Sequence, residues 1–262
     1  MNPWGGESKR KRTTTVALLA SFAAAGAALA PAAFADGSQG DTKITKVVVN
    51  GGKDVVIGAT NVKKFTVSVT ATDDQGIKSA DITLNGPGYG IFTTSSVKCV
   101  AASATTSTCS TSFTVDPRVY DVTSDQAGTW YVDAWVDANG DDSNFIWKEK
   151  AGGFKLQRLS KLTVNAAPEP VKKGRTITVT GALTRASWAY GKYVGYTGQP
   201  VKLQFKKKGA GAYATVKTIK TTSGGALKTT VKASVDGTYR YAFAGTTTTP
   251  AVNATGDYID VR

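Results

Sequence analysis

The sequence predicts an all-β fold built from two tandem β-sandwiches that follow a cleaved leader segment. Three observations support this prediction. Helix-favouring residues are scarce, since Glu149 and Glu169 are the only glutamates after residue 35, whereas Thr, Val, Gly and Ser are abundant. Short runs of alternating apolar and polar residues are separated by Gly, Asn and Asp turns, as in a sandwich. Parts of the first half also recur in the second half.

Residues 1–35 are expected to form a secretory signal peptide. The basic residues 9–12 precede an apolar run from Thr15 to Ala30 that is too short and too rich in Ala to be a stable membrane span. The small-x-small stretch Ala33–Ala35 is a pattern that signal peptidase accepts, which places cleavage before Asp36. No second apolar run of membrane length follows. We therefore expect a secreted protein, extracellular or loosely associated with the cell wall.

Alternating apolar and polar residues predict where the first strands of the mature chain lie. Phe65, Val67 and Val69 point to one face of a strand, and a turn at residues 73–76 separates it from a second strand at residues 77–85. A third strand follows at residues 130–136. Its apolar even-numbered residues face one way, and the other face carries Tyr131, Asp133 and Trp135. One of these two faces must belong to a core.

An internal repeat predicts two copies of one unit. Gly128–Val132 recurs as Gly237–Tyr241, displaced by 109 positions, and Lys46–Asn50 recurs as Lys161–Asn165, displaced by 115 positions. This period is near the size of an immunoglobulin-type domain. An aromatic residue two positions after a strand-opening Gly is typical of the corner that leads into strand F of that fold.

Six stretches of the second half are familiar from a known family: Leu162–Asn165, Val171–Arg175, Thr178–Gly181, Gly198–Phe205, Thr222–Gly225 and Gly237–Gly245. Together they resemble the immunoglobulin-like modules of secreted actinobacterial (Streptomyces-type) proteins, over most of residues 158–262. The first half resembles bacterial immunoglobulin-like modules less specifically, through Thr70–Ile77 and Val136–Gly140. The resemblance implies modules that serve adhesion, spacing or ligand binding. No activity transfers with such a fold.

The two predicted domains differ in net charge. Residues 36–157 contain 11 Lys and Arg against 14 Asp and Glu, whereas residues 158–262 contain 17 against 4. A mildly acidic N-terminal immunoglobulin-like domain is therefore expected to precede a strongly basic C-terminal one. Outside the cell, a basic module meets anionic polymers rather than intracellular nucleic acid, so we expect no specific nucleic-acid partner. The sequence does not indicate the oligomeric state.

The chain contains no histidine, which removes the usual general base and the commonest transition-metal ligand. Ser-His-Asp and Cys-His hydrolysis are thereby excluded, and no motif supports a Ser-Lys dyad or a catalytic carboxylate pair. We expect a non-enzymatic protein with no catalytic residues. Cys99 and Cys109 form an even pair in an exported chain, so they predict a disulfide that would add about 3 kcal/mol of stability.

The first candidate site is a polyanion-binding surface on the basic domain. Lys206, Lys207 and Lys208 lie at the tip of a predicted hairpin whose turn is Gly209–Gly211. The same surface is expected to include Lys172, Lys173 and Arg175. Such a surface could hold anionic cell-wall polymers or acidic polysaccharide. The alternative is that Lys-rich strands only prevent edge pairing and keep a secreted β protein soluble.

We expect no cofactor except calcium, for which the second candidate is a site in the acidic domain. Its oxygen ligands would be the following residues: Asp133, Asp137, Asn139, Asp141 and Asp142. Asp137, Asn139 and Asp141 have the spacing of the start of an EF-hand loop, but Lys148 occupies the position of its bidentate Glu. The alternative is a polar hairpin turn in which Asn139 and Gly140 supply positive φ.

The third candidate is a carbohydrate-stacking site. Four rings are interleaved with glycines in one stretch: Trp188, Tyr190, Tyr193 and Tyr196. Rings displayed on a Gly-rich loop can stack on sugar faces, and Lys192 could meet an acidic sugar. The alternative is that the rings fold back and cover one end of a sandwich core.

Overall fold

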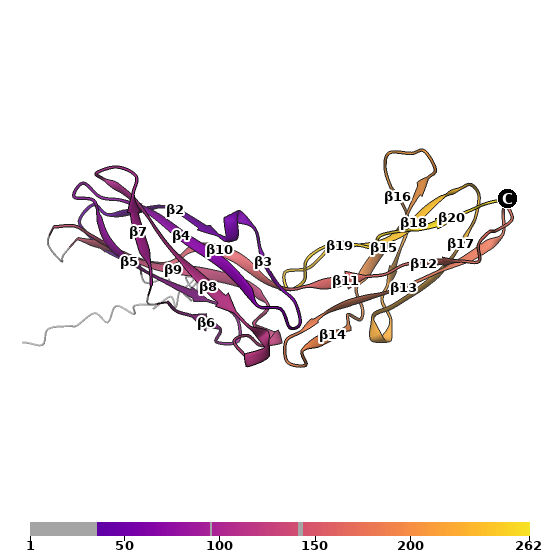
Figure 1. Cartoon of the computed structure of the whole chain (residues 1–262), viewed down its shortest axis with the longest axis horizontal. Helices are drawn as coiled ribbons and strands as arrows, with labels where there is room; N and C mark the ends of the chain where they lie inside the picture. The colour runs from indigo at the N-terminus through magenta and orange to yellow at the C-terminus, as the bar shows by residue number, and fades with distance from the viewer. Residues whose placement is uncertain (1–35, 95, 141–143) are drawn as a thin grey trace, which may run out of the picture. The chain divides into compact units, whose positions relative to one another are not determined.

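The computed structural model describes residues 36–94, 96–140 and 144–262 (Figure 1), so the predicted signal peptide lies outside the described residues. In the first half the strands are β1 (Gly37–Gln39), β2 (Lys43–Val49), β3 (Val55–Ile57), β4 (Lys63–Thr72), β5 (Ile77–Asn85), β6 (Ile91–Phe92), β7 (Lys98–Ala101), β8 (Thr106–Val115), β9 (Gly128–Ala138) and β10 (Phe145–Arg158). In the second half they are β11 (Ser160–Leu162), β12 (Asn165–Ala167), β13 (Thr176–Ser187), β14 (Lys192–Gly195), β15 (Pro200–Lys207), β16 (Ala214–Lys220), β17 (Ala226–Lys232), β18 (Gly237–Phe243), β19 (Val252–Asn253) and β20 (Asp257–Ile259). Short 3-10 turns are η1 (Asn50–Gly52), η2 (Pro117–Val119), η3 (Ser124–Gln126) and η4 (Ser223–Gly225), and the described residues contain no α-helix.

The first ten strands form two sheets that face each other. One sheet has the order β1-β10-β9-β5-β6, with β3 also paired to β10, and the other has the order β2-β4-β8-β7. In immunoglobulin nomenclature these are the CFG and ABED sheets, with β9 as strand F and β4 as strand B. The prediction of an all-β, immunoglobulin-like sandwich fold is confirmed.

The core of the first sandwich is centred on Trp130, which is completely buried. The predicted corner at the start of β9 is present, because the Trp130 indole N–H donates to the carbonyl of Gln126, four residues upstream, at 2.7 Å. Phe92 stacks on the indole with ring centroids 4.9 Å apart. A glycine is required at position 86, since an added Cβ there would lie 2.1 Å from the Trp130 ring. The even-numbered face of β9 is therefore the core face.

The opposite face of β9 points outward and carries the odd-numbered residues. Trp135 stacks on Phe145 of β10 with ring centroids 4.6 Å apart, and the ring of its direct cross-strand partner Trp147 lies 6.0 Å away. Asp137 accepts hydrogen bonds from Ser79 at 2.9 Å and from the Trp135 indole at 2.6 Å. These contacts tie β5, β9 and β10 together on the outer surface.

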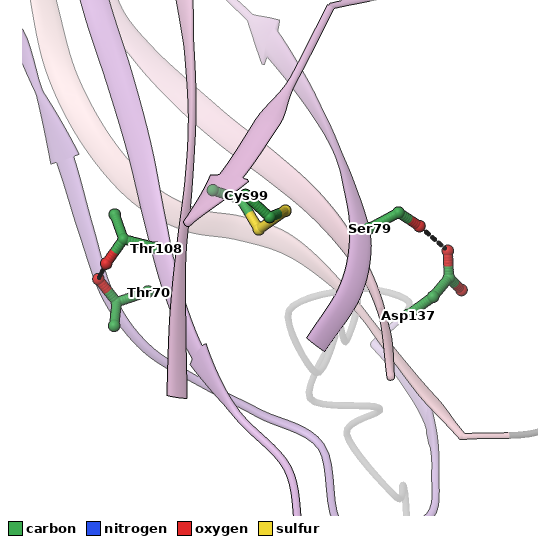
Figure 2. Close-up of a disulfide and its surroundings, with 6 residues drawn as sticks. Thr70, Ser79, Cys99, Thr108 and Asp137 are labelled. Atoms are coloured by element: carbon green, nitrogen blue, oxygen red, sulfur yellow. Dashed lines mark hydrogen bonds between the residues drawn. A yellow bond between two sulfur atoms is a disulfide. The ribbon is translucent and has the colours of Figure 1, made fainter. Parts of the chain in front are cut away.

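The predicted disulfide between Cys99 and Cys109 joins β7 to β8, where the two residues are direct cross-strand partners. Figure 2 shows its sulfur atoms on the side of this sheet that faces β5, and Cys109 is completely buried in the core. On the outer side of the same sheet, the hydroxyls of Thr70 and Thr108 lie 3.0 Å apart. The disulfide therefore links the edge strand β7 to β8, whose Cys109 lies in the first core.

The second sandwich is organised around β13, whose 12 residues pair with β11, β12, β14 and β17. The facing sheet has the order β16-β15-β18-β19, with β20 also paired to β18. Alternation is regular along β18, where Gly237, Tyr239, Tyr241 and Phe243 are buried. Tyr241 is fully buried, and its hydroxyl donates to the carbonyl of Val179 on β13 at 2.9 Å. This bond links the two sheets through the core.

Buried apolar residues form two clusters. The first includes residues from Val49 to Leu156, and the second includes residues from Leu162 to Ile259. The predicted boundary after residue 157 falls between them, but Ala186 and Trp188 of the second half belong to the first cluster. The division into domains 36–157 and 158–262 therefore stays a prediction.

Candidate functional site

The structure brings two groups of predicted polyanion-binding residues to one end of the second sandwich. The backbone N–H of Lys208 donates to the carbonyl of Asp236 at 2.9 Å, just before β18 begins. The Asp236 carboxylate in turn accepts from the backbone N–H of Val261 at 2.9 Å. Val261 forms a parallel bridge with Val171, the residue that precedes Lys172. This chain of contacts joins segments that are far apart in the sequence.

We call this region the basic end and define it by eight side chains: Lys172, Lys173, Arg175, Lys206, Lys207, Lys208, Lys232 and Arg262. Lys206 is half-buried and the other seven are exposed. Two of the eight are paired, Lys208 with Asp236 at 3.4 Å and Arg262 with Asp260 at 3.0 Å. Within the described part of the chain, the other six form no ion pair. Positive charge at this end is therefore largely uncompensated.

A hollow of about 500 Å³ lies beside Lys172 and Arg175. Pro168 and Pro170 form part of its wall, and Gly174 and Thr176 complete it together with Val171. In the other basic segment, the Lys206 ammonium lies 5.0 Å from the centroid of the Tyr213 ring. The basic end thus combines a cationic recess with exposed lysines around it.

Asp236 and its neighbours determine the charge state of Lys208 at this end. The pKa of Asp236 is lowered, chiefly by the hydrogen bond from the Val261 backbone. The pKa of Lys208 is raised, first by neighbouring Tyr258 and then by Asp236. Both groups are therefore charged at neutral pH, and Asp236 cancels the charge of Lys208 alone.

The predicted carbohydrate-stacking residues do not form one exposed platform. Trp188 is only 1% exposed, and its indole N–H points to the carbonyl of Ile57 at 3.4 Å, so its ring cannot reach a sugar. Tyr193 and Tyr196 are half-buried, and each ring face is covered by a cation at 3.8 Å, from Lys161 and Arg185 respectively. Tyr190 is freely exposed. The expectation that four rings form one stacking site is wrong for Trp188, because its side chain is packed in the core of the first sandwich.

The predicted calcium ligands that the structure describes do not converge. Asp133 and Asp137 lie on the same face of β9, but four residues of strand separate them by about 13 Å. The Asp133 carboxylate accepts from the Asn85 amide at 2.5 Å and from the Lys150 backbone at 2.8 Å. The Asn139 amide donates to the carbonyl of Gln75 at 3.1 Å. Two further predicted ligands, Asp141 and Asp142, lie outside the described residues.

A different acidic group was not predicted. Oxygen atoms of Asp41, Asp73 and Asp74 lie within 4.8 Å of one another. Asp73 is almost completely buried and accepts a hydrogen bond from the Thr42 hydroxyl at 2.7 Å. Pairing of β2 with β4 brings these residues together. No sequence spacing reveals such a group, because its members come from two different strand ends.

Comparisons with known proteins identify no family. No family model and no curated protein matches the chain. Solved structures with similar folds include a DUF4785 family protein from Legionella pneumophila (11% identity, TM-score 0.36, covering 75% of this chain and 51% of that one). Another contains the three N-terminal domains of the outer capsid protein Hoc of bacteriophage RB49 (12% identity, TM-score 0.34, 84% and 70% covered). A third is the D00-D0 domain of intimin (15% identity, TM-score 0.27, 82% and 99% covered).

The chain spans about half the length of the Legionella protein. At TM-scores below 0.5 these similarities support no conclusion about this chain. Across the part of the chain that the structure describes, no helix is long and apolar enough to cross a membrane.

Proposed function

We propose that this protein is an exported, non-enzymatic binding protein whose basic end holds anionic polymers of the cell envelope. The observation that supports it is the convergence of Lys172, Lys173 and Arg175 with Lys206, Lys207 and Lys208 at one end of the second sandwich. In the sequence these two groups are separated by 30 residues, and the fold places them together.

Charge and exposure favour a long flexible polyanion over a small ligand. Of the eight cations at this end, only two are paired with an acidic side chain in the described structure, with Asp236 and Asp260. The lysines are mostly exposed, so each would contribute a weak, water-screened contact. A polymer with repeated anionic groups can engage several such contacts at once, and the recess beside Arg175 can receive one of those groups. Teichoic acids and acidic polysaccharides have this repeated charge.

Salt dependence tests the proposal. Purified protein, residues 36–262, is incubated with isolated cell walls, and the bound fraction is measured from about 0.05 M to about 1 M NaCl, over which the Debye length falls from above 10 Å to about 3 Å. We expect strong binding at low salt and release at high salt. Retention that does not change across this range would contradict an electrostatic contact.

A charge-matched pair of variants locates the contact. The triple variant Lys172→Ala, Lys173→Ala and Arg175→Ala should bind about tenfold more weakly, if each contact contributes about 0.5 kcal/mol. The control removes the same number of charges from the first sandwich, at Lys43, Lys46 and Lys64, all of which are exposed. Equal loss in both variants would mean that net charge, and not the basic end, determines binding.

A further inference from the structure

Two arginines without an acidic partner meet where β10 ends and β13 passes. Arg158 is the last residue of β10, and Arg185 lies on β13 opposite Ser160. Residues 244–250, which follow β18, run alongside, because the backbone N–H of Arg158 donates to the carbonyl of Thr248 at 3.0 Å. The Arg158 side chain therefore lies against β13, and the Arg185 side chain reaches residues 244–250.

Arg158 is buried yet keeps free hydrogen-bond donors. Its exposed fraction is 8%, and its Nε–H donates to the carbonyl of Ala186 at 2.6 Å. Its two Nη nitrogens form no hydrogen bond with any residue that the structure describes. Because no fully enclosed side-chain nitrogen of the described chain lacks a partner, these Nη groups must reach the surface. The Arg158 Nη groups therefore offer a fork of N–H donors to a ligand that binds beside them.

Arg185 adds a second positive charge to the same place. Its guanidinium lies 3.8 Å from the centroid of the Tyr196 ring, and its Nη1 approaches the hydroxyls of Thr248 and Thr249 at 3.4 and 3.3 Å. The pKa of Arg158 falls to about 10, mainly because of burial and then because of the charge of Arg185. Burial also lowers the pKa of Arg185. Among the described residues, no carboxylate forms an ion pair with either one.

Threonine hydroxyls complete the surroundings. The hydroxyl of Thr246 lies 3.2 Å from that of Thr248 and 3.4 Å from that of Tyr196. Thr246 is exposed and Thr248 is half-buried, so the group is open to solvent on one side. Two guanidinium groups and several hydroxyls offer donors and positive charge, and no carboxylate of the described residues is ion-paired with either guanidinium.

We propose that Arg158, Arg185 and the Thr246–Thr249 segment form a binding site for a phosphate or sulfate group. The free Nη fork of Arg158 matches two oxygens of such an anion, and an arginine fork is well suited to this bidentate contact. The hydroxyls of Thr246 and Thr248 can donate to the remaining oxygens. The anion would supply the missing countercharge. The site is independent of the basic end, since it shares no residue with it.

Inorganic phosphate and sulfate are the first probes. Residues 36–262 are titrated with each anion against NaCl of matched ionic strength, and binding is followed by the melting temperature and by the Nε–Hε NMR signals of the arginines. We expect a saturable rise in melting temperature and shifts of the Arg158 and Arg185 signals that exceed those of Arg118. Absence of both effects with the free anions would overturn a site for the free ion and leave only a site for a phosphate group within a polymer, which polyphosphate tests.

Arg185→Gln removes one charge and keeps an amide donor, and we expect it to weaken phosphate binding at least about tenfold. Arg240→Gln is the matched control, because Arg240 also lies 3.8 Å from a tyrosine ring centroid, that of Tyr213. Equal affinity in the wild type and Arg185→Gln, or equal loss in both variants, overturns the proposal. If Arg185→Gln does not fold, Thr248→Val replaces it, with the same expectation in direction.

Titration with polyphosphate distinguishes a site for the free phosphate ion from a site for a phosphate group within a polymer. Binding of inorganic phosphate that depends on Arg185 identifies a free-ion site, and Arg185-dependent binding of polyphosphate alone identifies a site for a phosphate group within a polymer. If neither ligand binds in a manner that depends on Arg185, the proposal is wrong. The triple variant of the basic end is included in each titration. Because it retains both arginines, its loss of polymer binding reports on the proposed function and leaves phosphate binding at this site intact.

Discussion

Removing the hydroxyl of Tyr241 should destabilise the second sandwich in a way that depends on pH. The Tyr241 side chain is fully buried, and its hydroxyl donates to the carbonyl of Val179 across the core at 2.9 Å. In Tyr241→Phe that bond is lost while the ring stays. At pH 7 we expect the free energy of unfolding to fall by about 1–3 kcal/mol, as for other buried hydrogen bonds.

The alkaline range gives a sharper test. Burial raises the pKa of Tyr241 to about 12, compared with 10.0 for an ordinary tyrosine. The folded protein therefore holds this proton more tightly than the unfolded chain does, so the associated stability is complete below pH 10 and is lost as the pH rises through 12. The full loss corresponds to about 2.7 kcal/mol, and about half of it, or about 1.4 kcal/mol, is expected at pH 11.

Urea denaturation of the wild type and Tyr241→Phe at pH 7 and pH 11 measures this effect. Other titrating groups are common to both proteins, so the difference in stability between them isolates Tyr241. We expect that difference to shrink by about 1.4 kcal/mol at pH 11, because only the wild type is penalised there. Tyr190→Phe, whose ring is 74% exposed, serves as the control and should match the wild type at both pH values. An equal wild-type advantage at pH 7 and pH 11 would refute the reasoning.

Three further outcomes can be measured. Trp188→Ala should lower the free energy of unfolding by about 3–5 kcal/mol because it empties part of the first core, whereas Tyr190→Ala should have almost no effect; equal urea midpoints for the two would contradict this. Replacing Cys99 and Cys109 together by alanine should lower it by about 3 kcal/mol, and an unchanged midpoint would show that the bridge does not stabilise the fold. If the alternative calcium hypothesis is correct, Ca²⁺ at about 0.1–1 mM should raise the melting temperature and Asp137→Asn should abolish the rise; calorimetry without heat would remove that hypothesis.

Local pattern was sufficient to predict much of the fold. The predicted strand at residues 77–85 coincides with β5, and the alternation at residues 130–136 correctly divides β9 into an apolar and a polar face. The predicted corner aromatic, Trp130, makes the expected backbone hydrogen bond. These features depend on side-chain periodicity and turn chemistry, which short stretches of sequence contain.

Contacts between residues far apart in the sequence could not be predicted from local pattern. Nothing in a Gly-rich aromatic stretch tells which core will take Trp188, because that choice depends on the partner surface. Two basic runs could be predicted, but their meeting depends on the bridge between Val171 and Val261. The proximity of Arg158 and Arg185 likewise follows from how β10, β13 and residues 244–250 come together.

The pairing of β3 with β10 gives the first sandwich a mechanical property. Val55–Ile57 runs parallel to Leu156–Arg158, so the chain enters this pair and leaves it in the same direction. Tension applied at Val55 and at Arg158 would pull β3 toward its start and β10 toward its end. Parallel strands pulled in this way slide lengthwise, and their hydrogen bonds stretch together instead of opening one at a time.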